Sequence, residues 1–422
     1  MRRPLIVLAV LAVLVGGAVA VYVVHRLNQS PDERGSTTVE YVTTGTTEAP
    51  PPAGVPWPTY GFSNDRTRSV RLVLRPPFRT IWRYQAASLV EFPPSIGYHR
   101  LFFSTNAGTF AAISEKTGKY AWKYSAHRCV AASPAIGPHA HGTVYETFLN
   151  RPPCNAQNGG HGVDGEVIAF SVGHGKIHWR HVIGPSESSP LLVGDRLYVG
   201  DWKGDVWAFD SNHGGVVWHR HIAHGAIKGA LAYAGGHLFV GSYDGHVYCL
   251  SRGGTVLWRG SAQPRLFGGS PFYSTPAVAY GRVYIGSNDG KVYAFGAASG
   301  HRLWSHSTGG YVYASPAIWR QRVLVGSYSG TFYALDAGTG EPRWTFKAGG
   351  PISGSAVVIG HVVYFATLQE KHLENGRTYA LDARNGKLLW AFPDGKYTPV
   401  VAAQGELFLV GYGVIYGMVP KR

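Results

Sequence analysis

A tryptophan recurs along this chain at intervals of about 40 residues, and this repeat restricts the possible folds more than any other feature. The series comprises Trp82, Trp122, Trp179, Trp218, Trp258, Trp304, Trp344 and Trp390. A second series of small residues precedes the glycine-containing turns and comprises Ala112, Ala169, Ala208, Cys249, Ala294, Ala334, Ala380 and Gly417. A period near 40 residues is typical of the blades of a β-propeller, each built from four short strands.

Each repeat reads as four short strands joined by tight turns. Asp244-Gly245 and Asp289-Gly290 lie between alternating apolar runs, which is a strong hairpin signal. Glycine accounts for 56 of 422 residues and charged residues for only 15%, a composition that argues against a helical protein. We expect the tryptophans to be packing anchors that fill the gaps between blades, and the small residues to lie where neighbouring blades approach closely.

The two series are out of phase at the ends of the chain. Trp82 has no repeat before it, and Gly417 has no tryptophan after it. Pairing the C-terminal strands (about 398–420) with a strand around 79–84 closes the ring and leaves no open sheet edge. We therefore predict an all-β, eight-bladed propeller of four-stranded blades as one domain over residues 57–422.

The N-terminus predicts a membrane segment. Arg2 and Arg3 precede an uncharged run of twenty-one residues, Pro4–Val24, which is long enough to cross a bilayer. Ala18-Val19-Ala20 resembles a signal-peptide cleavage site, so a cleaved signal is the alternative to an uncleaved anchor. We predict a single-pass transmembrane signal-anchor over residues 1–27, with the paired arginines cytoplasmic and the C-terminal domain outside the cytoplasmic membrane.

Residues 28–56 are rich in Ser, Thr and Pro, and we expect them to form a disordered linker between membrane and propeller. No cysteine lies in or just after the membrane segment, which argues against a lipid-modified lipoprotein. Residues 1–56 carry four arginines and four acids, so the net charge of +15 belongs to residues 57–422. A basic surface favours acidic polymers, anionic lipids, acidic proteins or nucleic acid as partners, although it also serves solubility alone.

Two of the three cysteines bracket an insertion in the second repeat, around residues 139–163. In an exported domain Cys129 and Cys154 can form a disulfide, which would staple this loop. Cys249 belongs to the small-residue series and is expected to be a buried, inert thiol. His213, His219, His221 and His224 crowd together, but a repeat-related cluster at His178 and His181 favours exposed outer-strand positions over a metal site.

The repeat over residues 323–344, with its Tyr-Ala-Leu-Asp, Thr-Gly and Trp, resembles the PQQ-type repeat. Trp57-Pro58-Thr59-Tyr60-Gly61-Phe62, followed by Asn64 and Arg66, is similar to the first segment of the same families. The resemblance covers about residues 57–420 and implies the propeller fold. It implies two classes of function, since such repeats occur both in quinoprotein alcohol dehydrogenases and in BamB-like assembly factors of bacterial envelopes.

The resemblance makes PQQ and calcium the cofactors of the enzymatic alternative. Catalytic members of the family carry adjacent cysteines, a calcium held by acidic and amide side chains, and a catalytic Asp. This chain has no Cys-Cys pair and no Cys-x-x-Cys-His haem site, and Glu91 and Glu187 are the acids expected near the axis. We therefore expect no cofactor, no metal and no catalysis.

The expected function is a membrane-anchored, BamB-like scaffold or binding module of the bacterial cell envelope. Its partners would be an envelope protein or an acidic surface polymer, with no nucleic acid, and the domain would be monomeric. The alternatives are a quinoprotein oxidoreductase and an extracytoplasmic sensory domain. The candidate partner-binding residues occupy equivalent places before the innermost strands: Arg128, Glu187, Lys228, Tyr273, Tyr311, Tyr313, Lys396 and Tyr397.

Overall fold

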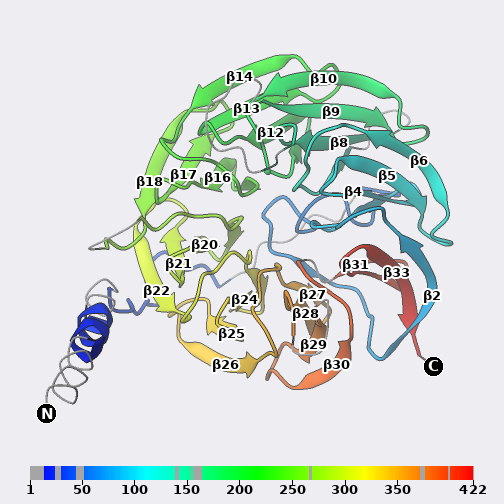
Figure 1. The fold of residues 1–422 in the computed structure, drawn as a ribbon. Helices are drawn as coiled ribbons and strands as arrows, with labels where there is room; N and C mark the ends of the chain where they lie inside the picture. Colours follow the sequence, from blue (N-terminus) through cyan, green and yellow to red (C-terminus); the bar gives the residue numbers. More distant parts are fainter. Residues whose placement is uncertain are drawn as a thin grey trace, which may run out of the picture.

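The repeats form a closed ring of eight blades around one axis (Figure 1). The computed structural model describes residues 14–23, 30–43, 52–137, 142–152, 154, 164–265, 269–370, 376–397 and 400–421. In seven blades the chain runs outward through four antiparallel strands, from the innermost strand at the axis to the outermost at the rim. The predicted fold is therefore confirmed.

Blades 1 to 4 occupy the first half of the ring. Blade 1 contains β3 (Ser95–Gly97), β4 (Arg100–Ser104), β5 (Thr109–Ser114) and β6 (Tyr120–Ser125). Blade 2 contains β7 (Ala135–Gly137), β8 (Thr143–Phe148), β9 (Gly165–Ser171) and β10 (Ile177–Ile183). Blade 3 contains β11 (Leu191–Val193), β12 (Arg196–Gly200), β13 (Asp205–Asp210) and β14 (Val216–His221). Blade 4 contains β15 (Ala232–Ala234), β16 (His237–Gly241), β17 (His246–Ser251) and β18 (Val256–Ser261).

Blades 5 to 8 complete the ring. Blade 5 contains β19 (Ala277–Ala279), β20 (Arg282–Gly286), β21 (Lys291–Gly296) and β22 (Arg302–Ser307). Blade 6 contains β23 (Ala317–Trp319), β24 (Arg322–Gly326), β25 (Thr331–Asp336) and β26 (Pro342–Lys347). Blade 7 contains β27 (Val357–Ile359), β28 (Val362–Ala366), β29 (Thr378–Asp382), β30 (Leu388–Phe392) and the added β1 (Ser69–Val70). Blade 8 contains β31 (Val400–Ala403), β32 (Glu406–Val410), β33 (Val414–Pro420) and β2 (Phe78–Gln85).

Blade 8 closes the ring by joining the two ends of the propeller. β2 pairs antiparallel with β33, and Trp82 lies directly opposite Gly417. This is the closure that the out-of-phase tryptophan and small-residue series predict. Because β2, from the N-terminal end of the propeller, is the outermost strand of blade 8, opening the ring requires the loss of its whole pairing with β33.

The tryptophans anchor each blade to the next. In seven blades the indole nitrogen Nε1 donates to a carbonyl oxygen in a turn of the following blade, as Trp304 does to Ala337 O at 3.0 Å. The indole rests on the glycine of that turn: a Cβ at Gly340 would lie 2.7 Å from Trp304 Cδ2. The prediction of interblade packing anchors is confirmed for these seven.

The small residues have a different role from the one we expected. Each lies directly opposite the tryptophan of its own blade, as Ala294 lies opposite Trp304 and Ala380 opposite Trp390. A Cβ at Gly417 would lie only 2.2 Å from Trp82. The position is small because the indole of the neighbouring strand folds across it, within one sheet.

Residues 57–70, here called the plug segment, run around the inside of the ring and contact successive innermost strands. Trp57 exchanges backbone hydrogen bonds with Ile96 of blade 1, and Pro58 O accepts from Ile136 N of blade 2. Further on, carbonyls of the plug segment accept from Tyr233, Val278, Ile318 and Val358, in blades 4, 5, 6 and 7. Arg66 and Arg68 of this segment are fully buried. The plug segment thus ties seven blades together, because Thr59 also donates to Pro190 O of blade 3.

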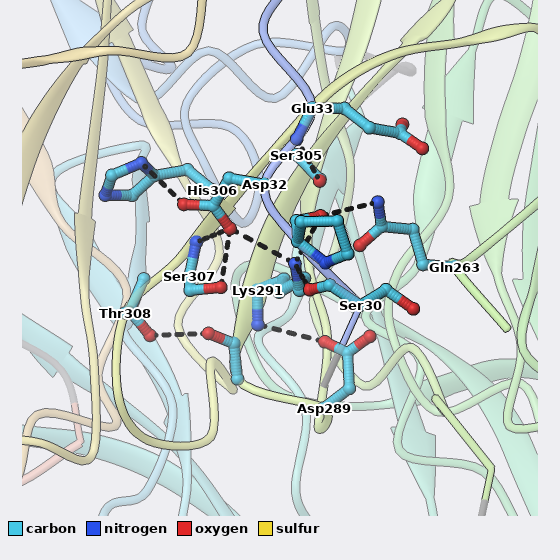
Figure 2. A network of polar contacts seen from close by, with 12 residues as sticks. Ser30, Asp32, Glu33, Gln263, Asp289, Lys291, Ser305, His306, Ser307 and Thr308 are labelled. Atoms are coloured by element: carbon cyan, nitrogen blue, oxygen red, sulfur yellow. Dashed lines mark hydrogen bonds and ion pairs between the residues drawn. The ribbon is translucent and has the colours of Figure 1, made fainter. Parts of the chain in front are cut away.

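Residues 30–43, here called the strap, lie on the outer surface of blades 5 and 6, contrary to the expected disordered linker over 28–56. Glu33 pairs with Ser305 of β22 through two backbone hydrogen bonds. Asp32 lies 3.1 Å from Lys291 Nζ (Figure 2). Glu33 forms a bidentate ion pair with Arg302. Polar contacts therefore fix a segment whose composition provides no apolar core.

The strap also encloses a buried cation. Arg282 is fully buried, and its guanidinium donates to the carbonyl oxygens of Ser36, Val39, Glu40, Ala337 and Gly338. Burial lowers the pKa of this guanidinium. Residues 52–56 are likewise part of the fold, since Val55 is fully buried in the cluster shared by blades 1 and 2.

The structure describes a helix over residues 14–23, and no helix among the described residues is both long and apolar enough to cross a bilayer. Most of the predicted membrane segment, residues 4–13 and 24, lies outside the described residues, so the anchor stays a prediction. Most of the insertion at 139–163 also lies outside them. Cys129 and Cys154 form the predicted disulfide, with Cα atoms 5.6 Å apart, and Cys249 is a buried thiol.

Candidate functional site: the axial pocket

One position in every blade faces the axis at the end where the loops lead into the innermost strands, here called the mouth. It lies four residues before each innermost strand and is occupied by Glu91, Ala131, Glu187, Lys228, Tyr273, Tyr313, Ser353 and Lys396. Six of these eight residues line a single pocket of about 550 Å³, all except Ala131 and Lys396. The repeat thus brings side chains from distant parts of the chain to one site.

A belt of hydroxyl groups lies two residues further along the same loops and explains the recurrent Ser/Thr-Pro motif. The hydroxyl of one blade accepts a hydrogen bond from the backbone amide of the preceding blade: Ser189 from Ser133 (2.9 Å), Thr275 from Ala230 (2.9 Å), Ser315 from Thr275 (3.0 Å) and Ser355 from Ser315 (3.0 Å). These bonds fix the spacing between blades, and hence the positions of the mouth residues just above them.

The floor of the pocket is Tyr60 from the plug segment. Its hydroxyl lies 2.7 Å from Ser355 Oγ and 3.3 Å from Ser315 Oγ in the hydroxyl belt. The guanidinium of Arg68 lies 4.5 Å from the centre of its ring. Burial alone would raise the pKa of Tyr60, but Arg68 and the two serine hydroxyls outweigh burial and lower it. The channel is therefore closed beneath the mouth and forms a blind pocket.

One wall of the pocket contains an ion pair held between aromatic rings. Lys228 Nζ lies 3.4 Å from Glu187 Oε1, and both side chains are almost completely buried. The same ammonium lies 4.1 Å from the ring centre of Trp202 and 5.2 Å from that of Tyr243. Burial raises the pKa of Glu187, and Lys228 opposes this effect. The ammonium is thus neutralised and enclosed within the protein.

The remaining wall combines a second acid with tyrosines. Burial and the neighbouring Glu187 raise the pKa of Glu91 to about 7, so this carboxyl is partly protonated at neutral pH. Burial, Glu187 and Glu91 raise the pKa of Tyr273 well above its usual value. The rings of Tyr273 and Tyr313 meet edge to face, with centres 5.2 Å apart. The pocket therefore offers neutral phenol groups and aromatic faces rather than a concentrated charge.

The rim of the mouth is more exposed. Tyr311 is 53% exposed; its ring contacts that of Tyr328 edge-on and that of Tyr313 at a tilt. Across the mouth, Lys396 Nζ lies 4.5 Å from the ring centre of Tyr412 and 5.9 Å from that of Tyr397. Tyr397 also lines the pocket. Tyrosine is among the residue types enriched at the centres of protein interfaces.

The prediction for Arg128 is wrong. Its side chain is 5% exposed and forms ion pairs with Asp164 (3.0 Å) and Glu166 (3.4 Å) instead of facing the axis. Arg128 lies seven residues before β7, whereas the axial position of blade 2 is Ala131.

Sequence reasoning placed seven of its eight candidates in or beside the mouth but missed several lining residues. Tyr243 and Tyr328 follow the second strands of blades 4 and 6, and Tyr60 comes from the plug segment. Their common signal is an aromatic residue two positions after the Val-Gly that ends a second strand, at the same place as Trp202 of blade 3. Tyr60 has no such signal, because it lies outside the repeats.

The histidine cluster lies on the outer strand of blade 3, as expected. His219 and His221 both face Asp205, at 3.1 and 2.9 Å, and the His219 ring stacks on Trp207 with ring centres 3.8 Å apart. Within the described part of the chain, no three His, Cys, Asp or Glu side chains are arranged to hold a metal ion.

Comparisons with known proteins agree with this architecture. The crystal structure of BamB from Moraxella catarrhalis aligns with a TM-score of 0.63 and 18% identity, covering 82% of this chain and 99% of that one. Quinohemoprotein alcohol dehydrogenase from Comamonas testosteroni aligns with a TM-score of 0.70 and 14% identity, covering 87% of this chain and 81% of that one. At these identities both show the shared fold alone.

Sequence similarity places this chain with BamB rather than with the dehydrogenase. The outer membrane protein assembly factor BamB of Burkholderia pseudomallei is 28% identical over 141 residues, a third of each chain. The matched part thus spans about a third of that relative's length. The family model described as outer membrane protein assembly factor BamB matches residues 203–317 and 308–418, just over half of the chain. The chain therefore belongs to the BamB family of PQQ-like β-propellers.

Proposed function

We propose that this chain is a non-catalytic binding module of the bacterial cell envelope that holds a protein partner against the mouth of its propeller. The observation that carries the proposal is the ring of axial positions, where rigid blades converge on a blind pocket with exposed tyrosines and Lys396 at its rim. Membership of the BamB family supports it, because the family's description names a factor in outer membrane protein assembly. The proposed setting is the membrane surface, with the N-terminal segment as anchor.

Tyrosine-rich rims suit a protein partner for a physical reason. A tyrosine supplies a large apolar area and one hydrogen-bonding group while losing little conformational entropy, so interfaces are enriched in it. Tyr311 and Tyr412 are 53% and 42% exposed; the ring of Tyr311 contacts that of Tyr313, and the ring of Tyr412 lies against the ammonium of Lys396. A preorganised rim of this kind binds without a further ordering cost.

The pocket does not fit the PQQ and calcium of the quinoprotein alternative. PQQ carries three carboxylates, but Lys228 is the cation among the described residues that line the pocket, and Glu187 already neutralises it. Calcium prefers six to eight oxygen ligands, usually with several ionised carboxylates. The acids here are Glu187, paired with Lys228, and Glu91, whose pKa of about 7 leaves it partly neutral. The similarity in fold to the dehydrogenase therefore does not support a quinoprotein reaction in this pocket.

A mouth variant tests the proposal. Lys228→Ala, Tyr311→Ala and Lys396→Ala together should reduce recovery of the envelope partner from solubilised membranes by about tenfold or more, because central aromatic and charged contacts dominate interface energies. The control carries Lys119→Ala, Tyr120→Ala and Lys123→Ala, on and just before β6 at the outer edge of blade 1, where Tyr120 is 54% exposed. Quantitative mass spectrometry compares the two baits. Equal recovery of the partner by both variants would contradict the proposal that the mouth binds it.

A further inference from the structure

The far end of the axis, opposite the mouth, holds a second cavity. It is a groove of about 560 Å³ between the plug segment and the turns that follow the innermost strands of blades 5, 6 and 7. One side is the chain from Ser69 to Val73, and the other is formed by Tyr280, Trp319, Arg320 and His361. Tyr60 and the rest of the plug segment separate it from the axial pocket, so the two cavities belong to opposite faces.

The groove is bordered by an unpaired strand edge. β1 is the terminal strand of the blade 7 sheet and pairs in parallel with β27 alone. Arg68 O accepts from Val358 N and Val70 O from Gly360 N, so the alternate residues Ser69 and Arg71 turn their backbone groups away from β27 and toward the groove. The last bond from the plug segment to blade 6 is the one from Ile318 N to Thr67 O. An edge of this kind can add one more strand.

Cations surround this edge. Arg71 and Arg320 line the groove, and both are exposed. The guanidiniums of Arg320 and Arg322 lie 5.0 and 5.7 Å from the ring centre of Trp319. Among the described residues, no carboxylate forms an ion pair with any of these three arginines. The acid in the lining is Asp65, whose Oδ1 already accepts from the Ser63 hydroxyl and from the Thr67 amide and hydroxyl.

The turn that carries Arg320 adopts a costly backbone. Arg320 and Gln321 have φ angles of 43° and 58°, in the left-handed region where tight hairpins normally use glycine or asparagine. Gly235 and Gly236 occupy the equivalent turn of blade 4. The same left-handed φ recurs at Tyr98 and His99 of blade 1 and at Tyr280 of blade 5, so it belongs to the hairpin that the blades share, and in blade 6 it places Arg320 at the groove.

We propose that this groove binds an extended acidic segment of a partner protein. The segment would pair its backbone with the free edge of β1 at Ser69 and Arg71 and place alternate carboxylates beside Arg71 and Arg320. Apolar side chains on its other face would contact Trp319, Ile318 and the 85% exposed Val73. Together with the mouth, the propeller would then hold two partners on opposite faces.

Binding of a synthetic peptide to the full-length protein tests this proposal. The probe is a fluorescein-labelled peptide of alternating Glu and Val, followed by fluorescence anisotropy at low and at physiological salt. Arg71→Gln with Arg320→Gln should weaken binding by about tenfold or more, because charge-assisted hydrogen bonds are stronger than neutral ones and the variant loses two of them. The matched control, Lys119→Gln with Lys387→Gln, removes the same charge from exposed turns elsewhere and should leave the affinity within about twofold.

Two further arms separate strand addition from simple charge attraction and from the mouth. A peptide with N-methyl groups on alternate backbone nitrogens cannot pair with β1 and should lose binding, whereas the Lys228, Tyr311 and Lys396 variant should bind the unmodified peptide normally. Equal binding of the N-methylated peptide, or an unchanged affinity in the Arg71 and Arg320 variant, would overturn the proposal. Loss of binding in the mouth variant would place the peptide in the axial pocket and would overturn it as well.

Discussion

At the scale of single residues, one unusual side chain is a fully buried acid away from both the axial pocket and the groove. Glu146 lies on β8 and is fully buried; its Oε2 accepts from Ser104 Oγ at 2.7 Å and its Oε1 from Thr147 N at 2.9 Å. Burial raises its pKa from 4.5 to about 8, so the folded protein keeps it protonated. The equivalent position is Val199 in blade 3 and Val240 in blade 4.

This carboxyl makes stability depend on pH. Between about pH 4.5 and 8 the unfolded chain has lost the proton that the folded chain keeps, so stability falls as pH rises across that window. Glu146→Gln retains the shape and the hydrogen bonds without titrating, and it should gain up to roughly 3 kcal/mol over the wild type between pH 5 and 7. Urea unfolding of both proteins at these two pH values measures the gain, and parallel pH profiles would refute it.

Individual residues also show where sequence reasoning succeeded. Glu187, Lys228, Tyr273 and Tyr313 were found because the repeat places them in equivalent positions. Arg128 was misplaced because the equivalent position of blade 2 is Ala131, three residues further along the chain, and Tyr60 was missed because it lies outside the repeats.

At the scale of elements, the contact between a tryptophan and the next blade's turn is the recurrent unit of assembly. In the turn after β13, Gly214 has a φ of 73° and a Cβ there would lie 2.5 Å from Trp179, whereas a Cβ at the adjacent Gly215 would meet nothing within 4 Å. Gly214→Ala should therefore destabilise the protein by roughly 2 kcal/mol or more, while Gly215→Ala should change stability by about 0.5 kcal/mol at most. Thermal unfolding of this pair checks the prediction, and equal effects would contradict it.

The strap is the element that composition misjudged. Its Ser, Thr and Pro content predicts disorder, since it offers no apolar periodicity, yet its three acids each contact blade 5. Polar anchoring of this kind depends on cations far away in the sequence, such as Lys291 and Arg302, and so has no local signature.

Neutralising the strap's acids tests its docking. Asp32→Asn with Glu33→Gln removes the partners of Lys291 and Arg302, and the amides of Glu33 and Gly35, bonded to Ser305 O and Thr339 O, should exchange with solvent about tenfold faster. Hydrogen–deuterium exchange measures this change. Asp195→Asn, an exposed acid on blade 3, provides the control and should have no effect on these amides. Unchanged protection in the double variant would show that backbone contacts alone hold the strap.

At the scale of the whole molecule, blade number and ring closure could be predicted because two repeat series with a fixed offset leave one way to close the ring. The internal plug segment could not, because it reaches six of its seven blades through backbone hydrogen bonds, which need no particular side chains. The result is a ring closed at its rim by β2 and β33 and filled at its centre, with a blind pocket on one face and a basic groove on the other. A closed ring with a filled centre is rigid, and such a molecule is suited to holding partners in fixed positions.

The most direct test of a binding role for the mouth is photo-cross-linking in cells. A benzoylphenylalanine at position 311, on the exposed rim of the mouth, is compared with one at position 120, on the outer edge of blade 1; the two tyrosines are 53% and 54% exposed. The account predicts a discrete cross-linked envelope protein from position 311 that is absent from position 120. The same products from both positions, or a partner captured at position 120 alone, would contradict it.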